Sequence, residues 1–208
     1  MKILHLSFSA RGEHSESLAL SRKVVSHLLA ARTGASASIT ERMLGMEPLP
    51  HIDTHYSLVQ HSAADPTQQG GSMARSDEAI AQLAQADVVV IGTPMHNLSV
   101  PSALKAWLDH VVRARHTFTM TAQGKVGTLR DRPVLIAIAS GGRFSGEQAR
   151  QPDFLTPYLR ELLKTIGLRD LHFFSVEGTG ARPEAVATAR AAAELSLQRF
   201  FETFRLPA

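Results

Sequence analysis

Residues 88–94 read Val-Val-Val-Ile-Gly-Thr-Pro, and this stretch decides the fold. Four consecutive β-branched residues are typical of a central parallel strand, because such a strand is buried on both faces. Residues 101–111 then begin with a proline and place apolar residues at helical spacing, which predicts an amphipathic helix. A buried strand followed directly by such a helix is the repeating unit of α/β domains.

The same alternation of strand and helix runs through most of the chain. Strands are predicted at residues 3–6, 36–39, 88–94, 133–139 and 171–176, and helices at 15–34, 76–85, 101–111, 155–166 and 183–204. This order predicts a flavodoxin-like α/β fold: a five-stranded parallel sheet, strand order 2-1-3-4-5, with helices on both faces. Because no linker, repeat or low-complexity segment interrupts the pattern, we expect a single domain over residues 1–208.

Two segments depart from this alternation. Residues 44–72 lose their hydrophobic periodicity and contain several prolines, so we expect a mostly irregular loop whose position suits a lid. Residues 117–128 predict a short hairpin-like excursion. The basic cluster Arg113, Arg115 and His116 is expected to be a solvated helix end. Trp107 is expected either in the core or at a dimer interface. Four other large side chains are expected in the core: Met43, Met46, Phe173 and Phe174.

The composition excludes several classes of protein. The chain has 208 residues, 44% of them hydrophobic, which is too apolar for a disordered protein. The net charge of +3 is not clustered, so neither nucleic acid nor a membrane surface is an expected partner. The absence of cysteine excludes thiol catalysis and thiolate metal sites. No apolar run is long enough for a signal peptide or a membrane span, so we expect a cytoplasmic protein.

The predicted topology places candidate chemistry in the loops that follow the first, third and fourth strands. The first of these loops, residues 9–17, is rich in serine and leads into a helix N-terminus, which together suit an anion. The triphosphate and Rossmann glycine fingerprints are absent, so a phosphate monoester fits better. The alternative is an ordinary helix capped by Ser15.

The other two loops suit a flat heterocycle. Residues 93–101 hold Asn97 and apolar side chains between two prolines, and residues 139–144 contain the pair Gly141-Gly142, which allows a ligand close to the backbone. Each loop alone could be a plain connection or turn. Because the three loops converge in the predicted fold, their combination suggests a flavin mononucleotide (FMN) site.

The most specific stretch is Pro94-Met95-His96-Asn97-Leu98-Ser99-Val100-Pro101-Ser102-Ala103-Leu104-Lys105-Ala106-Trp107-Leu108-Asp109-His110. With the serines of residues 9–17, the 117–128 segment and the Gly141-Gly142 turn, it resembles the FMN-dependent NADH-azoreductase family of the flavodoxin-like quinone reductase superfamily. The resemblance covers nearly the whole chain. It implies a homodimer that binds FMN and passes two electrons, by ping-pong kinetics, from NADH or NADPH to quinones or azo compounds.

The resemblance also implies a role for particular residues. The phosphate of FMN would be held by Ser9, Ser15, Glu16 and Ser17. The ring would be lined by Met95, His96, Asn97 and Leu98, and its polar edge would meet Ala139, Ser140, Gly141 and Gly142. No protein group need act as a nucleophile, although His96 could supply a proton to the acceptor. No metal site is expected, because no carboxylate pattern accompanies His51 and His55.

The sequence departs from the family at three positions, and two other functions remain open. His96, Leu98 and Met120 stand where aromatic residues are usual in the family, which puts the substrate preference in doubt. One alternative is an electron carrier of the flavodoxin type, although carriers tend to be strongly acidic. The other is a flavin-free interaction protein, which predicts a disrupted phosphate loop.

Overall fold

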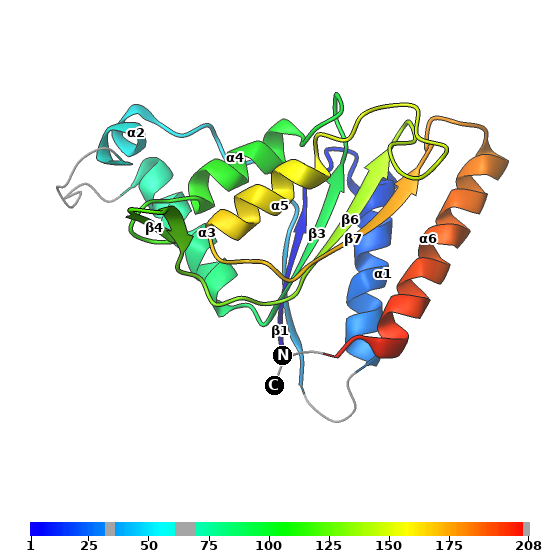
Figure 1. Cartoon of the computed structure of the whole chain (residues 1–208), viewed down its shortest axis with the longest axis horizontal. Coiled ribbons are helices and arrows are strands. Elements are labelled where there is room, and N and C mark those ends of the chain that lie inside the picture. The colour runs from blue at the N-terminus through cyan, green and yellow to red at the C-terminus, as the bar shows by residue number, and fades with distance from the viewer. Residues whose placement is uncertain (32–35, 61–69, 206–208) are drawn as a thin grey trace.

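A five-stranded parallel sheet lies at the centre of the computed structural model, which describes residues 1–31, 36–60 and 70–205 (Figure 1). The strands are β1 (Lys2–Ser7), β2 (Ser38–Arg42), β3 (Val88–Pro94), β6 (Val134–Ser140) and β7 (Leu171–Glu177), in the order β2-β1-β3-β6-β7. Counting only these strands, the order is 2-1-3-4-5, so the predicted fold and topology are confirmed.

Helices cover both faces of the sheet. They are α1 (Glu16–Ala30), α2 (Thr54–Gln60), α3 (Gly71–Gln85), α4 (Ser102–Val111), α5 (Thr156–Thr165) and α6 (Pro183–Thr203), with a 3-10 turn, η1, at Gly12–His14. Val88 and Val90 of β3 pack in a core with α1 and α6, whereas Val89 and Ile91 pack in a second core with α3, α4 and α5. The run of β-branched residues is therefore buried on both faces, as the sequence predicts.

The segment 44–72 is more regular than predicted. It contains α2, and α3 begins at Gly71 rather than at residue 76. The carboxylate of Asp53 explains both helix starts, because it accepts hydrogen bonds from the backbone N–H groups of Tyr56 (2.8 Å) and Ser72 (2.8 Å). The buried Tyr56 fixes α2 to α4 through a hydrogen bond from its hydroxyl to the Asp109 carbonyl (3.1 Å). Residues 61–69 lie outside the described residues.

The predicted hairpin is confirmed as the antiparallel pair β4 (Phe118–Thr121) and β5 (Gly124–Gly127). Trp107 and Phe174 are buried as expected, and Phe173 packs against the core. Met46 is 59% exposed, so its placement in the core was wrong. The expectation for Arg113 was also wrong: its side chain is buried and pairs with Asp77, because α3 packs against the end of α4.

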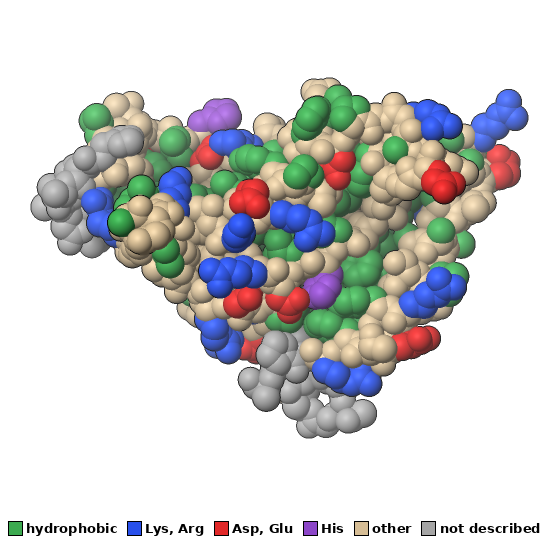
Figure 2. Space-filling model, in the orientation of Figure 1, with side chains coloured by type: hydrophobic (Ala, Val, Ile, Leu, Met, Phe, Trp, Pro, Cys, Tyr) green, Lys and Arg blue, Asp and Glu red, His purple; other side chains and the backbone are tan. Residues whose placement is uncertain are grey.

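The described residues contain no helix that is both long and apolar enough to cross a bilayer. On the face drawn in Figure 2, Lys and Arg side chains are interspersed with Asp and Glu. That face therefore carries no large patch of a single charge.

Candidate functional site

Three loops meet at the carboxyl end of the sheet, at the upper edge of the view in Figure 1. The loop after β1 is joined to β3 by a hydrogen bond from the Phe8 N–H to the Gly92 carbonyl (2.8 Å). The loop after β3 is joined to β6 by a hydrogen bond from the Met95 N–H to the Ala139 carbonyl (2.8 Å). The structure thus brings together the three loops that the sequence singles out.

The first loop gathers three buried serines at the start of α1. Ser15 is the N-cap: its hydroxyl accepts from the Leu18 N–H (3.2 Å), as in the capped-helix alternative that the sequence leaves open. The Ser15 and Ser17 hydroxyls lie 3.0 Å apart, and Ser9 Oγ accepts from the Arg11 N–H (3.3 Å). Only one hydroxyl proton of the three is used in these contacts, so two remain for an acceptor. The first N–H groups of α1 also lack partners within the helix.

Glu16 differs from its serine neighbours, because its carboxylate points toward α6. It forms a two-point ion pair with Arg190, in which Arg190 Nε lies 2.9 Å from a carboxylate oxygen. The hydrogen bonds from Arg190 lower the pKa of Glu16, so the carboxylate stays charged. Among the predicted phosphate-binding residues, Glu16 can therefore serve an anion only through its backbone N–H.

A buried histidine supports this loop from below. His5 of β1 has its Nε2 2.8 Å from the Ser21 hydroxyl of α1 and its Nδ1 3.0 Å from a carboxylate oxygen of Glu41 on β2. Burial lowers the pKa of His5, although Glu41 raises it in part. Ser21 also fills the space beside Gly92, where a Cβ would stand 2.6 Å from its hydroxyl oxygen. This contact fixes α1 closely against the sheet.

The loop after β3 is a strained tight turn. His96 and Ser99 exchange two backbone hydrogen bonds (3.0 and 2.9 Å), and the residues between them, Asn97 and Leu98, have φ angles of 48° and 70°. Asparagine tolerates this left-handed region, but leucine rarely adopts it. Such strain concentrates at functional sites. The turn exposes His96 and Asn97 and leaves Met95 buried beneath them.

The turn after β6 directs its carbonyl groups away from the other loops. The carbonyls of Ser140, Gly141 and Gly142 accept hydrogen bonds from the N–H groups of Thr179 (3.0 Å), Gly180 (3.3 Å) and Gly178 (3.2 Å). A Cβ on Gly141 would meet no atom within 4 Å, so this stretch of backbone is open to a ligand.

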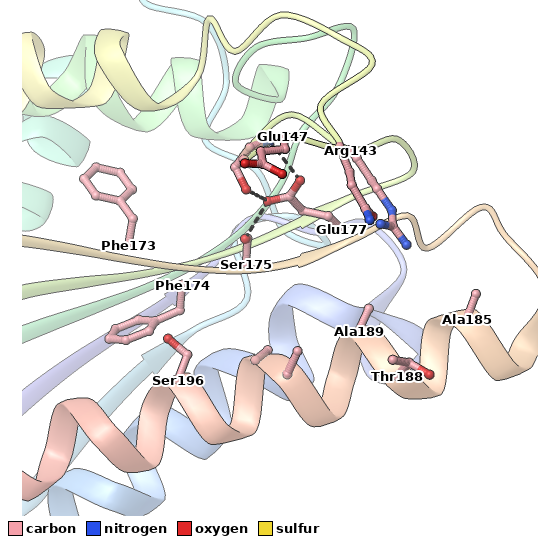
Figure 3. A pocket seen from close by; sticks show the side chains of 15 residues that line it. Arg143, Glu147, Phe173, Phe174, Ser175, Glu177, Ala185, Thr188, Ala189 and Ser196 are labelled. Atoms are coloured by element: carbon pink, nitrogen blue, oxygen red, sulfur yellow. Dashed lines mark hydrogen bonds between the residues drawn. The ribbon is translucent and has the colours of Figure 1, made fainter.

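Two side chains that the sequence reasoning missed hold this turn in place. Gln151 donates from Nε2 to the Ser140 hydroxyl (3.0 Å) and to the Met95 sulfur (3.1 Å). The Glu177 carboxylate accepts from the N–H groups of Phe144 (2.7 Å) and Ser145 (3.1 Å) and from the hydroxyls of Ser145 and Ser175. Figure 3 shows the contact between Ser175 and Glu177. No local pattern marks either residue, because each acts across a tertiary contact.

A groove of about 680 Å³ lies beside the turn, between β7 and α6. Figure 3 shows Arg143 near the α6 residues Ala185 and Thr188 at one end and Phe174 at the other. The groove is lined by none of the twelve residues predicted to bind the cofactor. It adjoins the turn through Arg143 and Glu177, which both line the groove.

Comparisons with known proteins agree with this architecture. The family described as having a flavodoxin-like fold matches residues 1–200. The chain is 41% identical over 202 residues to FMN-dependent NADH:quinone oxidoreductase 4 of Pseudomonas fluorescens, and the match covers 96% of each chain. It is 39% identical over 191 residues to FMN-dependent NADH:quinone oxidoreductase 5 of Burkholderia lata, covering 90% of each.

The chain belongs to the flavodoxin-like FMN-dependent NADH:quinone oxidoreductase family. The crystal structure of an azoreductase from Bacillus anthracis shares this fold, with a TM-score of 0.83 at 24% identity, and the match covers 98% of this chain and 100% of that one. The family resemblance predicted from residues 94–110 is therefore confirmed.

Proposed function

We propose that the protein is an FMN-dependent NADH:quinone oxidoreductase that transfers two electrons from NADH to quinones or azo compounds. One observation carries the proposal: the serine loop (residues 9–17), the strained 95–98 turn and the glycine turn (residues 140–142) lie at the same end of the sheet, in a chain 41% identical to such an enzyme along nearly its whole length. The carrier alternative has no comparable observation in its favour.

The serine loop fits a phosphate group. Ser9, Ser15 and Ser17 have two free hydroxyl protons among them, and these would be donated to the phosphate. Glu16 would contribute its backbone N–H. The positive end of α1 would favour the negative charge. The bond between Arg190 and Glu16 supports this assignment, because it turns the only carboxylate among these residues toward α6.

The two remaining loops fit a flat ring. Met95, His96, Asn97 and Leu98 would line it. The segment of Ala139, Ser140, Gly141 and Gly142, which is open at Gly141, would approach its polar edge. A bound FMN supplies the hydride chemistry. The protein would contribute position, together with backbone N–H donors that stabilise negative charge on the ring. We assign no essential acid or base, and His96 is the exposed titratable side chain on the turn.

We also infer that the enzyme is a cytoplasmic homodimer, as the family resemblance implies. Large apolar side chains exposed on the segments around the site support a second copy covering them: Met46 (59%), Leu58 (67%), Met120 (68%) and Phe154 (58%). Sedimentation velocity of the protein loaded with FMN tests whether it is a dimer.

The decisive experiment is an absorption spectrum of the protein after addition of FMN and desalting, followed by NADH and then a quinone. We expect retained flavin absorbance that NADH bleaches and the quinone restores. Retained flavin that NADH cannot bleach would favour an electron carrier. Absence of retained flavin would favour a flavin-free interaction protein.

A further inference from the structure

The carbonyl acceptors of the glycine turn, residues 140–142, are already engaged within the protein. All three carbonyls of residues 140–142 are occupied by the N–H groups of residues 178–180. The Ser140 hydroxyl is also engaged, because it accepts a hydrogen bond from Gln151 Nε2 and donates one to the Met95 sulfur (3.7 Å). A ligand at this turn therefore meets only acceptors that already take part in a hydrogen bond on these three residues.

The polar edge of an isoalloxazine ring requires both kinds of group. Its pyrimidine part carries two carbonyl oxygens and, when oxidised, a single N–H at N3. Backbone N–H groups can serve the two oxygens. The N3–H donor needs an acceptor, because a buried donor left unpaired weakens binding.

Gln151 carries such an acceptor in a fixed orientation. In this structure both hydrogens of its Nε2 are used, on Ser140 and Met95, which leaves Oε1 as the free end. Oε1 has no hydrogen-bond partner among the described residues. It lies 2.2 Å from the position that a Cβ on Gly142 would take, so it stands directly against the glycine turn.

We propose that Gln151 binds the cofactor, with its Oε1 accepting the hydrogen bond from N3–H of FMN. This assignment rests on the proposed function. Asn97 carries another carboxamide in the site, but no hydrogen bond from the described part of the chain holds that side chain. Gln151 is held by two, so it binds with less loss of conformational freedom. The absence of a side chain at residue 142 leaves the space that Oε1 occupies.

The test compares FMN with N3-methyl-FMN, which lacks the N–H donor. Dissociation constants are measured by flavin fluorescence on the cofactor-free full chain. The wild type should bind FMN about tenfold more tightly than N3-methyl-FMN, and Gln151→Ala should lose most of that preference. Gln151→Glu, which keeps an acceptor but loses the two donors that hold it, should retain only part of that preference. Gln148→Ala, in the neighbouring groove, is the matched control and should match the wild type.

A second variant tests the same contact without altering Gln151. Gly142→Ala places a Cβ where Oε1 lies, so it should reduce the preference for FMN while leaving the glutamine in the chain. An undiminished preference in folded Gln151→Ala would overturn the role of Gln151 alone. Failure of the wild type to bind either flavin would overturn the proposed function, and this inference with it.

Discussion

The two ends of the proposed FMN site, called the phosphate end and the ring end, are built in different ways. The phosphate end comes from one continuous segment, residues 9–17, in which the serines are brought together by the start of α1. The ring end is assembled from the 95–98 turn, the 140–142 turn, Gln151 and the backbone of residues 178–180. A local motif thus makes the phosphate end, whereas the ring end depends on contacts between distant segments.

This difference predicts how each end responds to substitution. At the phosphate end, single changes should act directly on the ligand. At the ring end, substitutions of residues that do not touch the ligand should also weaken its binding, because their side chains hold the turns in place. The following predictions test the contrast, beginning with the largest effect.

The phosphate end should fail when a negative charge enters it. Ser17→Asp would place a carboxylate within a few ångströms of the phosphate, and repulsion there is worth about 4 kcal/mol at an intermediate dielectric. We expect FMN affinity to fall by a factor of about a hundred or more. Fluorescence titration measures it. Ala19→Asp puts the same charge on the exposed side of α1 as a control, and equal losses in both variants would contradict the prediction.

The ring end should weaken when a supporting residue is changed. Glu177→Gln replaces one carboxylate oxygen with an amide that cannot accept from the loop donors, so the 143–145 segment loosens. Bonds to a charged acceptor contribute about 1.5–3 kcal/mol each, and we expect about a tenfold loss of FMN affinity. Glu147→Gln, in the same loop, should bind FMN like the wild type. A Glu177→Gln protein with unchanged affinity would show that the ring end needs no such support.

The helix that forms the phosphate end packs against the titratable side chain of His5, so the stability of the protein should depend on pH. Because the folded-state pKa of His5 is lowered, the unfolded chain binds a proton first as the pH falls. The stabilisation that neutral His5 contributes is therefore present above about pH 6.5 and is lost as the pH drops toward the pKa of His5 in the folded protein. We expect the free energy of unfolding to fall by at most about 1.4 kcal/mol per pH unit from this residue.

Denaturant unfolding at pH 7 and pH 5.5 measures this effect. His5→Gln should show a shallower pH dependence than the wild type over that interval. His14→Gln, which alters an exposed histidine, should keep the wild-type dependence. Equal pH dependence in all three proteins would contradict the role assigned to His5.

The smallest effect is expected at Glu16. Glu16→Gln removes the ion pair with Arg190, and a largely exposed pair of this kind contributes less than about 1 kcal/mol. FMN affinity should change less than about twofold, since only the backbone N–H of Glu16 would contact the phosphate. Isothermal titration calorimetry can measure the FMN affinity. A large loss of affinity would mean that the Glu16 carboxylate itself organises the loop.

The same contrast explains what the sequence could and could not predict. The buried run at 88–91 determines the sheet, and the Ser15 cap follows from local chemistry, so both were predictable. The start of α3 depends on Asp53, eighteen residues before Gly71, and the burial of Arg113 depends on Asp77. Gln151 and Glu177 likewise act through tertiary contacts, which hydrophobic periodicity does not register.

Leu98 sets stability and function in opposition at one position. A glycine or asparagine there would adopt the left-handed backbone more readily than leucine, so selection for heat resistance alone would favour them. Either replacement would also remove the branched apolar side chain proposed to line the ring. In a directed-evolution experiment, residue 98 should therefore drift toward glycine under thermal challenge and return to a bulky side chain when turnover is selected.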